Sequence, residues 1–329
     1  MNMQNRGWLV RIAGICVLFC GITAAAVAQT ERVDLVSSMD GEEQPVLYWA
    51  PPAAKQQPTP LFVFLHSWSG DFTQDNSKWL KVCQRENWIW LHPNFRGVNQ
   101  SPKACGSKFA RQDILDAVKW AHEQWRVDVQ QVFLAGVSGG GHMSALMAGH
   151  HQEHFSAVSS WVGPMDLAEW HRFHTKDGKP QRYAVMIEKS LLGAPGDSAE
   201  IDADYRDRSP VFHMHRSGDL PISVWAGIND GHTGSVPVSH SLRVFNGIAQ
   251  GNGTAQISDT EIEQLVRDRK LEQPLDSDSG EDELLGREIL LRRTSRESVI
   301  TIFDGGHESM PDAAVHWLKQ QRRRATVPE

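Results

Sequence analysis

Short apolar runs recur along the chain, and stretches with helical spacing separate them. Six such runs occur, at 61–65, 88–91, 132–135, 157–162, 222–226 and 299–303. Runs that are apolar on both faces are typical of strands buried between two layers of helices. The segment 33–49 instead alternates apolar and polar residues around Met39-Asp40-Gly41, which predicts an antiparallel hairpin at a sheet edge.

Helical patterns fill the segments between these runs. The residues of 114–121 repeat with the i, i+3, i+4, i+7 spacing of one apolar helix face. Further helices are predicted at 142–148, 259–269 and 315–324. Because strands and helices alternate, we expect an α/β fold, a three-layer sandwich with a mostly parallel sheet and an antiparallel N-terminal edge.

Two stretches interrupt this alternation. One, at about 170–215, is rich in His, Tyr, Arg and Pro, and the other lies at about 250–287. The second ends in an acidic run, 276–283, which we expect at the surface because blocks of like charge are usually solvated. The sequence therefore predicts a single domain over residues 29–329 that carries two insertions.

The N-terminal residues have the pattern of a secretory signal. Arg6 and Arg11 precede an uncharged stretch that contains Ala26-Val27-Ala28. A basic end, an apolar centre and small residues at the cleavage site predict a signal peptide over residues 1–28. The alternative is an uncleaved anchor, although the apolar centre is near the lower limit for spanning a bilayer. We expect a secreted or periplasmic protein, with no stable membrane insertion after cleavage.

Charge and cysteine content follow from this cleavage. Removing residues 1–28 takes away two arginines and no acidic residue, so the formal net charge changes from −7 to −9. Such an acidic chain is a poor candidate for binding nucleic acid or an anionic membrane surface. Cys83 and Cys105 remain, and in an oxidising compartment we expect them to form a disulfide. This bridge would contribute roughly 3 kcal/mol, and the alternative is two free buried thiols.

The stretch Gly136-Val137-Ser138-Gly139-Gly140 lies between the apolar run 132–135 and a predicted helix. In this context G-x-S-x-G is the pattern of a nucleophile elbow. The sharp turn exposes the serine hydroxyl at the tip of a helix, where developing negative charge is favoured. We therefore predict that Ser138 is a catalytic nucleophile rather than a small residue in a flexible loop.

A serine nucleophile needs a base, and the base needs an acid that orients it. In elbow folds the chain order is serine, acid, histidine. Asp230 follows the apolar run 222–226, and His307 follows the run 299–303 in a glycine-rich turn. These two residues are the predicted acid and base, and Asp166 is the alternative acid.

The oxyanion needs two backbone N–H donors. One is predicted at Gly139, the residue after the nucleophile. The other is predicted in the loop after 61–65, at Trp68, with Ser67 as the alternative. Trp161 and Trp170 fall in or beside loops at the same sheet edge, where aromatic side chains would suit substrate binding.

A metal-binding pattern also occurs. His150-His151-Gln152-Glu153-His154 matches H-x-x-E-H, a zinc-peptidase motif. Little helix remains at this point, and no third ligand is evident, so a solvated helix end is the preferred interpretation. The sequence predicts neither a metal site nor a cofactor.

The chain resembles the α/β-hydrolase superfamily, and in particular its prolyl-oligopeptidase-like branch of serine hydrolases. The matching segments are FVFLHSWSG, PNFRG, QDILDAVKW, GVSGGG, YRDRSP, GINDG and GGH. The resemblance implies a Ser138–Asp230–His307 triad. The segment GHTGSVPVSH after Asp230 is longer than the spacing D-x-x-VP that is common in this branch.

These features together predict a secreted serine hydrolase that forms an acyl-enzyme. A carboxylic-ester hydrolase is the preferred function, acting on a small-molecule or carbohydrate ester. A serine peptidase of the prolyl-oligopeptidase type uses the same chemistry and is the first alternative. A non-catalytic binding protein on a hydrolase fold is the second. The sequence does not define the oligomeric state.

Overall fold

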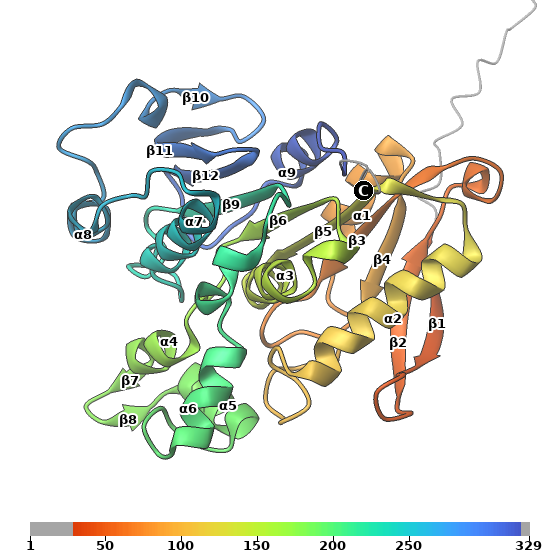
Figure 1. Cartoon of the computed structure of the whole chain (residues 1–329), viewed down its shortest axis with the longest axis horizontal. Helices are drawn as coiled ribbons and strands as arrows, with labels where there is room; N and C mark the ends of the chain where they lie inside the picture. Colours follow the sequence, from red (N-terminus) through yellow and green to blue (C-terminus); the bar gives the residue numbers. More distant parts are fainter. Residues whose placement is uncertain (1–28, 324–329) are drawn as a thin grey trace, which may run out of the picture.

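A ten-stranded mixed sheet forms the centre of the protein (Figure 1), whose computed structural model describes residues 29–323. The strand order is β1-β2-β4-β3-β5-β6-β9-β12-β11-β10. Neighbours from β4 to β12 pair in parallel, whereas the strands at both edges pair antiparallel. The predicted signal peptide at residues 1–28 lies outside the described residues.

The central strands are almost completely buried, as their unbroken apolar sequences predict. The parallel strands are β4 (Ile89–Pro93), β3 (Thr59–Leu65), β5 (Val127–Val137), β6 (Ala157–Trp161), β9 (Ile222–Gly227) and β12 (Ser298–Phe303). The edge strands are β1 (Glu31–Val36), β2 (Glu43–Trp49), β11 (Arg287–Ser295) and β10 (Glu281–Asp282). The predicted N-terminal hairpin and all six predicted core strands are thus confirmed.

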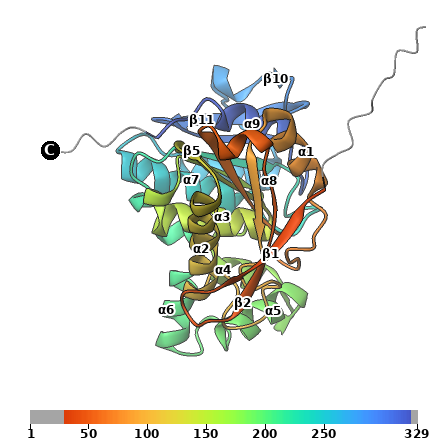
Figure 2. The same ribbon diagram turned by 90° about the vertical axis from the view of Figure 1, so that its right-hand side faces the viewer.

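Helices cover both faces of this sheet (Figures 1 and 2). On one face, α1 (Ser77–Glu86) packs against α9 (Pro311–Leu318). The other face carries α2 (Lys108–Gln124), α3 (Gly139–His150) and α7 (Ser239–Asn252). The three-layer α/β fold that the sequence predicts is therefore confirmed. The last helix ends at Leu318, earlier than the predicted 315–324.

A lobe of short elements occupies much of the first insertion and lies at one end of the sheet (Figure 1). It consists of α4 (Leu167–Phe173), the ribbon β7 (Thr175–Lys176) and β8 (Lys179–Pro180), α5 (Arg182–Leu191) and α6 (Ala199–Asp207). A second apolar cluster joins this lobe to the loops that follow β3 and β9, through Trp170 of the lobe, Trp68 and Val236.

The second insertion contains α8 (Asp259–Asp268) and leads into β10. Most of its acidic run is exposed, as expected, but Asp278 is only 3% exposed. Its carboxylate accepts hydrogen bonds from the main chain of Arg292 and Leu275 and pairs with Arg293. This one residue of the acidic run therefore anchors the run to β11.

Cys83 and Cys105 do not form the predicted disulfide; both are free and completely buried. Cys83 belongs to the main core on α1, whereas Cys105 belongs to the second apolar cluster beneath the lobe. Because the two thiols lie in separate apolar clusters, the alternative of two free buried thiols is correct. Burial raises the pKa of Cys105 to about 12 and that of Cys83 well above its usual value.

A buried ion-pair network fastens the N-terminal hairpin to the body. The side chain of Arg96 is 3% exposed, and its Nε lies 2.6 Å from the carboxylate of Asp113 on α2, which is 1% exposed. The same guanidinium pairs with Asp40 at 2.8 Å and with Glu42 at 2.7 Å, both in or beside the hairpin turn.

Replacement of Arg96 by Ala should destabilise the fold, because Asp113 would keep a buried charge without its cation. Removing one partner of a buried pair typically costs about 3–5 kcal/mol. Urea unfolding measures this change, and Arg32→Ala is the control because the Arg32–Asp34 pair is exposed. Exposed pairs contribute about 0–1 kcal/mol. Equal losses in the two variants would contradict a special role for the network.

Four fully buried histidines, His66, His92, His142 and His240, make the stability depend on pH, because burial lowers the pKa of each. Burial lowers the pKa of His92 to about 3 and those of His142 and His240 to about 4. The unfolded chain, with a histidine pKa of about 6.5, therefore binds protons first as the pH falls. The stability that these neutral side chains allow is present above about pH 6.5 and is lost toward about pH 4.

The unfolding free energy should therefore fall between about pH 6.5 and 4, by about 1.4 kcal/mol per pH unit for each such histidine. Denaturant titrations at several pH values measure the slope. His92→Gln should reduce the slope by about one histidine's share, since glutamine does not titrate. The same slope in His92→Gln and the wild type would show that His92 does not contribute.

No helix within residues 29–323 combines the length and apolar character needed to cross a bilayer.

Candidate active site

Ser138 occupies a strained turn between β5 and α3. Its φ of 60° and ψ of −117° lie in a region that non-glycine residues rarely adopt. Neighbouring backbone enforces this turn: a Cβ at Gly136 would lie 2.2 Å from the carbonyl oxygen of Gly140. A Cβ at Gly139 would lie 2.2 Å from the main-chain nitrogen of Trp68. The structure thus has the geometry of a nucleophile elbow, and Ser138 is half-buried at its tip.

Main-chain hydrogen bonds connect Ser138 to the loops that follow the neighbouring strands. Ser138 N donates to Trp161 O at 2.9 Å, and Val162 N donates to Trp225 O at 2.8 Å. One strand further, Asn229 N donates to Gly305 O at 2.9 Å. The ends of β5, β6, β9 and β12 are therefore tied together at the edge that carries the three predicted triad residues.

His307 and Asp230 form a hydrogen-bonded pair at this edge. Nδ1 of His307 lies 2.7 Å from Oδ2 of Asp230, whose side chain is 1% exposed. The other carboxylate oxygen accepts bonds from the main chain of Gly231 and Val236, each at 3.1 Å. Since an ionised carboxylate can only accept, this bond places the proton on Nδ1 and leaves Nε2 as the basic nitrogen.

The contact between serine and histidine is not made in this state. Within residues 29–323, neither Ser138 Oγ nor His307 Nε2 has a hydrogen-bond partner. Contacts of this kind are often long in a free enzyme and tighten when substrate binds. Ser138 Oγ and His307 Nε2 are therefore both free to form this hydrogen bond. The role of Ser138 in the triad stays a prediction.

The acidic residues that compete with Asp230 have other partners. Asp166 caps α4, where its Oδ1 accepts a bond from Glu169 N at 2.9 Å. Glu308 pairs with Arg287 at 3.0 Å, and Asp304 accepts a bond from Asn229. Of these four acidic residues, Asp230 is thus the one bonded to His307.

The main chain of the two predicted oxyanion donors lies close together, since a Cβ at Gly139 would lie 2.2 Å from Trp68 N. Trp68 N makes no hydrogen bond to any described residue, whereas Ser67 N donates to Gln74 at 2.8 Å. This difference favours Trp68 over Ser67 as the second donor.

The side chains of Trp161 and Trp170 are not exposed to a substrate, contrary to the prediction. They are 0% and 1% exposed. Trp161 stacks on Trp225 with ring centroids 4.8 Å apart, and its Nε1 donates to Ser159. Trp170 packs edge-to-face on Trp68 at 4.7 Å. Both residues fill apolar layers beside the site because large aromatic surfaces are more stable when buried.

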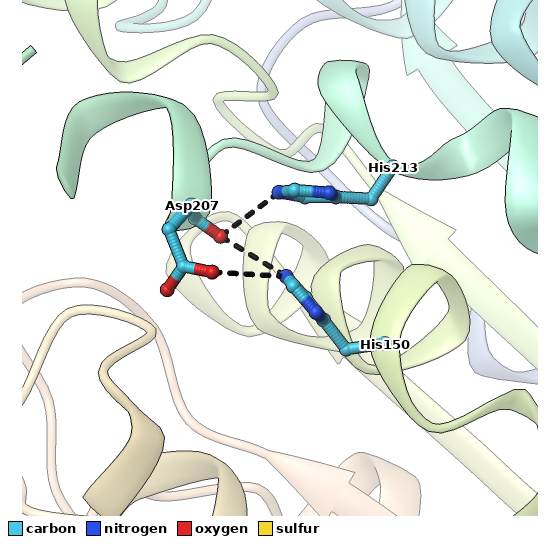
Figure 3. Close-up of side chains that lie close together, drawn as sticks. All are labelled: His150, Asp207 and His213. Carbon is cyan, nitrogen blue, oxygen red and sulfur yellow. Dashed lines mark hydrogen bonds and ion pairs between the residues drawn. The ribbon is translucent and has the colours of Figure 1, made fainter. Parts of the chain in front are cut away.

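The first histidine of the zinc-like motif, His150, contacts a neighbouring helix. The helix α3 ends at His150, and 152–154 forms a 3-10 turn, so His150 and His154 do not share one helix face. Instead, His150 and His213 converge on Asp207 at the end of α6 (Figure 3). Their Nε2 atoms lie 3.1 and 3.0 Å from the main-chain oxygen of Asp207.

This arrangement caps a helix rather than holding an ion. A carbonyl oxygen can only accept, so both Nε2 atoms carry protons and are not free as metal ligands. Arg111 also lies 2.9 Å from the Asp207 carboxylate and would repel a cation there. Burial lowers the pKa of His150 to about 4, which keeps the ring neutral.

Sequence reasoning missed the groups that hold the Asp230 carboxylate. These are the N–H groups of Gly231 and Val236, together with Gly234, where a Cβ would lie 2.1 Å from Asp230 Oδ1 and 3.0 Å from the His307 Cβ. The unusual spacing between Asp230 and Val236-Pro237 was the available signal, because extra residues after a catalytic acid must be accommodated around it.

The three-layer fold and the turn that holds Ser138 resemble those of the α/β hydrolases. Residues 107–261 match the family model of the prolyl oligopeptidase family, which confirms the resemblance stated from the sequence motifs. The sequence has no match among curated proteins. The family match and the fold support a serine hydrolase.

Solved structures of peptidases share the fold. A puromycin-hydrolyzing peptidase of Mycobacterium tuberculosis is 19% identical with a TM-score of 0.54, and the match covers 73% of this chain and 38% of that one. The acylaminoacyl peptidase of Pyrococcus horikoshii is 16% identical with a TM-score of 0.53, and the match covers 73% of this chain and 39% of that one. Oligopeptidase B of Leishmania major is 14% identical with a TM-score of 0.55, and the match covers 88% of this chain and 35% of that one. The match thus spans little more than a third of each of these peptidases.

Replacement of Asp230 by Asn should lower kcat by about 10⁴, because the imidazole would lose the carboxylate that fixes its tautomer. Steady-state kinetics on any turned-over substrate measures the change. Asp166→Asn is the matched control and should leave kcat nearly unchanged, since Asp166 caps α4 instead. A large loss in Asp166→Asn with a mild loss in Asp230→Asn would reverse the assignment.

Proposed function

We propose that the protein is a serine peptidase of the prolyl-oligopeptidase type that hydrolyses amide bonds of small peptides or aminoacyl derivatives. The observation that carries this proposal is the 2.7 Å bond between His307 Nδ1 and the buried carboxylate of Asp230, at the sheet edge where Ser138 is held in its turn. The family match and the three peptidases of the same fold favour an amide substrate.

The reaction follows from the positions of these groups. Ser138 Oγ attacks the substrate carbonyl carbon while His307 Nε2 takes the hydroxyl proton. The resulting imidazolium is stabilised by Asp230, and the N–H groups of Gly139 and Trp68 bind the oxyanion. As the intermediate collapses, the C–N bond breaks and Nε2 returns the proton to the leaving amine.

Hydrolysis of the acyl-enzyme completes the cycle. Water attacks the ester carbon of acylated Ser138 and gives its proton to His307 Nε2. The bond to Oγ then breaks, Oγ regains the proton, and the carboxylic acid leaves. Asp230 stays ionised throughout, because its role is to orient the imidazole and balance its charge.

The esterase preference drawn from the sequence has no support from the comparisons, and neither has a carbohydrate ester as substrate. An ester and an amide with the same acyl group pass through the same acyl-enzyme, so the two functions differ in the leaving group that the site can expel. A matched pair of substrates therefore separates them.

The purified chain should hydrolyse both an aminoacyl p-nitroanilide and the p-nitrophenyl ester of the same aminoacyl group. Ser138→Ala should abolish both activities, with unfolding curves unchanged, because the nucleophile is lost. Turnover of esters without any amide turnover would favour the esterase. A fluorophosphonate probe should label the wild type and not Ser138→Ala, and a folded wild type that is not labelled would favour a binding protein.

A further inference from the structure

The loop that follows Asp230 wraps around the carboxylate of this residue. Asp230 Oδ1 accepts from Val236 N at 3.1 Å, and the loop between them passes Gly234 within contact distance of both Asp230 and His307. A movement of this loop would therefore displace Val236 N, which donates to Asp230, and Gly234, which lies next to His307. We call residues 231–236 the acid loop.

Two side chains of the lobe hold the acid loop at one point. Nε1 of Trp170 donates to the carbonyl oxygen of Ser235 at 2.7 Å, and Nε2 of His174 lies 2.8 Å from the same oxygen. A carbonyl only accepts, so this His174 nitrogen carries the proton. Both acceptor positions of the Ser235 carbonyl are thus filled from α4 and the residue that follows it.

These two donors are themselves fixed by packing. The rings of Trp170 and His174 contact each other with centroids 5.2 Å apart, and each lies 4.9 Å from the ring of Tyr183 on α5. Trp170 is 1% exposed. Because a buried indole N–H without a partner would be costly, the bond to Ser235 is strongly favoured over an open alternative.

Trp170 also reaches the other half of the site. Its ring packs at 4.7 Å on Trp68, whose N–H is the predicted second oxyanion donor. One residue of the lobe therefore contacts both the acid loop and the loop that carries Trp68. These loops follow β9 and β3, which lie on opposite sides of β5 in the sheet.

We propose that Trp170 and His174 are positioning residues that, by clamping Ser235, hold the acid loop so that Asp230 orients His307. This inference rests on the proposed serine-hydrolase function. The lobe then supports the predicted triad through its contacts with the acid loop. The additional residues between Asp230 and Val236 allow this loop to reach Trp170 and His174.

The test compares variants that lose one donor each. Trp170→Phe keeps an aromatic ring and removes the N–H, His174→Leu removes the imidazole donor, and His174→Gln restores a donor. The matched control is Tyr205→Phe, which removes a buried hydroxyl that donates to Gly193 O at 3.1 Å within the lobe and does not reach the acid loop. The readout is the second-order rate of inactivation by a fluorophosphonate.

Trp170→Phe and His174→Leu should each slow inactivation about tenfold, which corresponds to the loss of one hydrogen bond of about 1.4 kcal/mol. His174→Gln should recover most of the rate, and Tyr205→Phe should stay within about twofold of the wild type. In an Asp230→Asn background, Trp170→Phe should change the rate by less than about twofold, because the carboxylate that it positions is gone.

A merely structural role of the lobe would give a different pattern. Wild-type rates in both donor variants, or an undiminished effect of Trp170→Phe in the Asp230→Asn background, would overturn the clamp. If Trp170→Phe does not fold, the comparison of His174→Leu with His174→Gln decides the question on its own.

A second readout separates this inference from the proposed function. The proton on His307 Nδ1 should give a downfield NMR signal in the wild type that shifts or broadens in His174→Leu and stays in Tyr205→Phe. If the wild type is not labelled by the probe, the proposed function fails, and an unshifted signal in His174→Leu would separately overturn the clamp.

Discussion

The site depends on the backbone conformation of Ser138, which its surroundings impose. With φ at 60°, an L-residue is strained, and the strain persists only because main chain crowds the turn on every side. The glycines at 136 and 139 allow β5, α3 and the loop carrying Trp68 to approach within contact of one another. This close approach places the main chain of Trp68 next to Gly139, the residue that follows Ser138.

The sequence predicted the sheet and the pairing of His307 with Asp230 because both rest on local signals. Apolar runs identified the six core strands, and the elbow, Asp230 and His307 each follow one of them. The antiparallel strand β11 was missed, since Arg292 and Arg293 follow its three apolar residues directly and place a charged side chain on each face. The cysteine pair and the two tryptophans were assigned wrongly, because compartment and loop position say nothing about which apolar cluster a side chain joins. Packing of that kind is settled by distant residues.

The lobe gives a physical meaning to a departure from the family pattern. Extra residues after Asp230 would loosen the acid if they were left exposed, since a longer loop has more conformations to lose. Here the carbonyl of Ser235 is bonded by Trp170 and His174, and the chain returns to give Val236 N to the carboxylate. The contacts with the helical lobe thus fix the conformation of the longer loop.

The two cysteines within residues 29–323, Cys83 and Cys105, can report on local unfolding of the protein. Each thiol is sealed in a different apolar layer, and burial holds the pKa of Cys105 near 12, so almost no reactive thiolate forms in the native state. An alkylating reagent therefore reads out local opening: modification of Cys83 reports the parting of α1 from the sheet, and modification of Cys105 reports the lifting of the lobe. Each of the two apolar clusters thus contains one native thiol whose alkylation reports on its exposure.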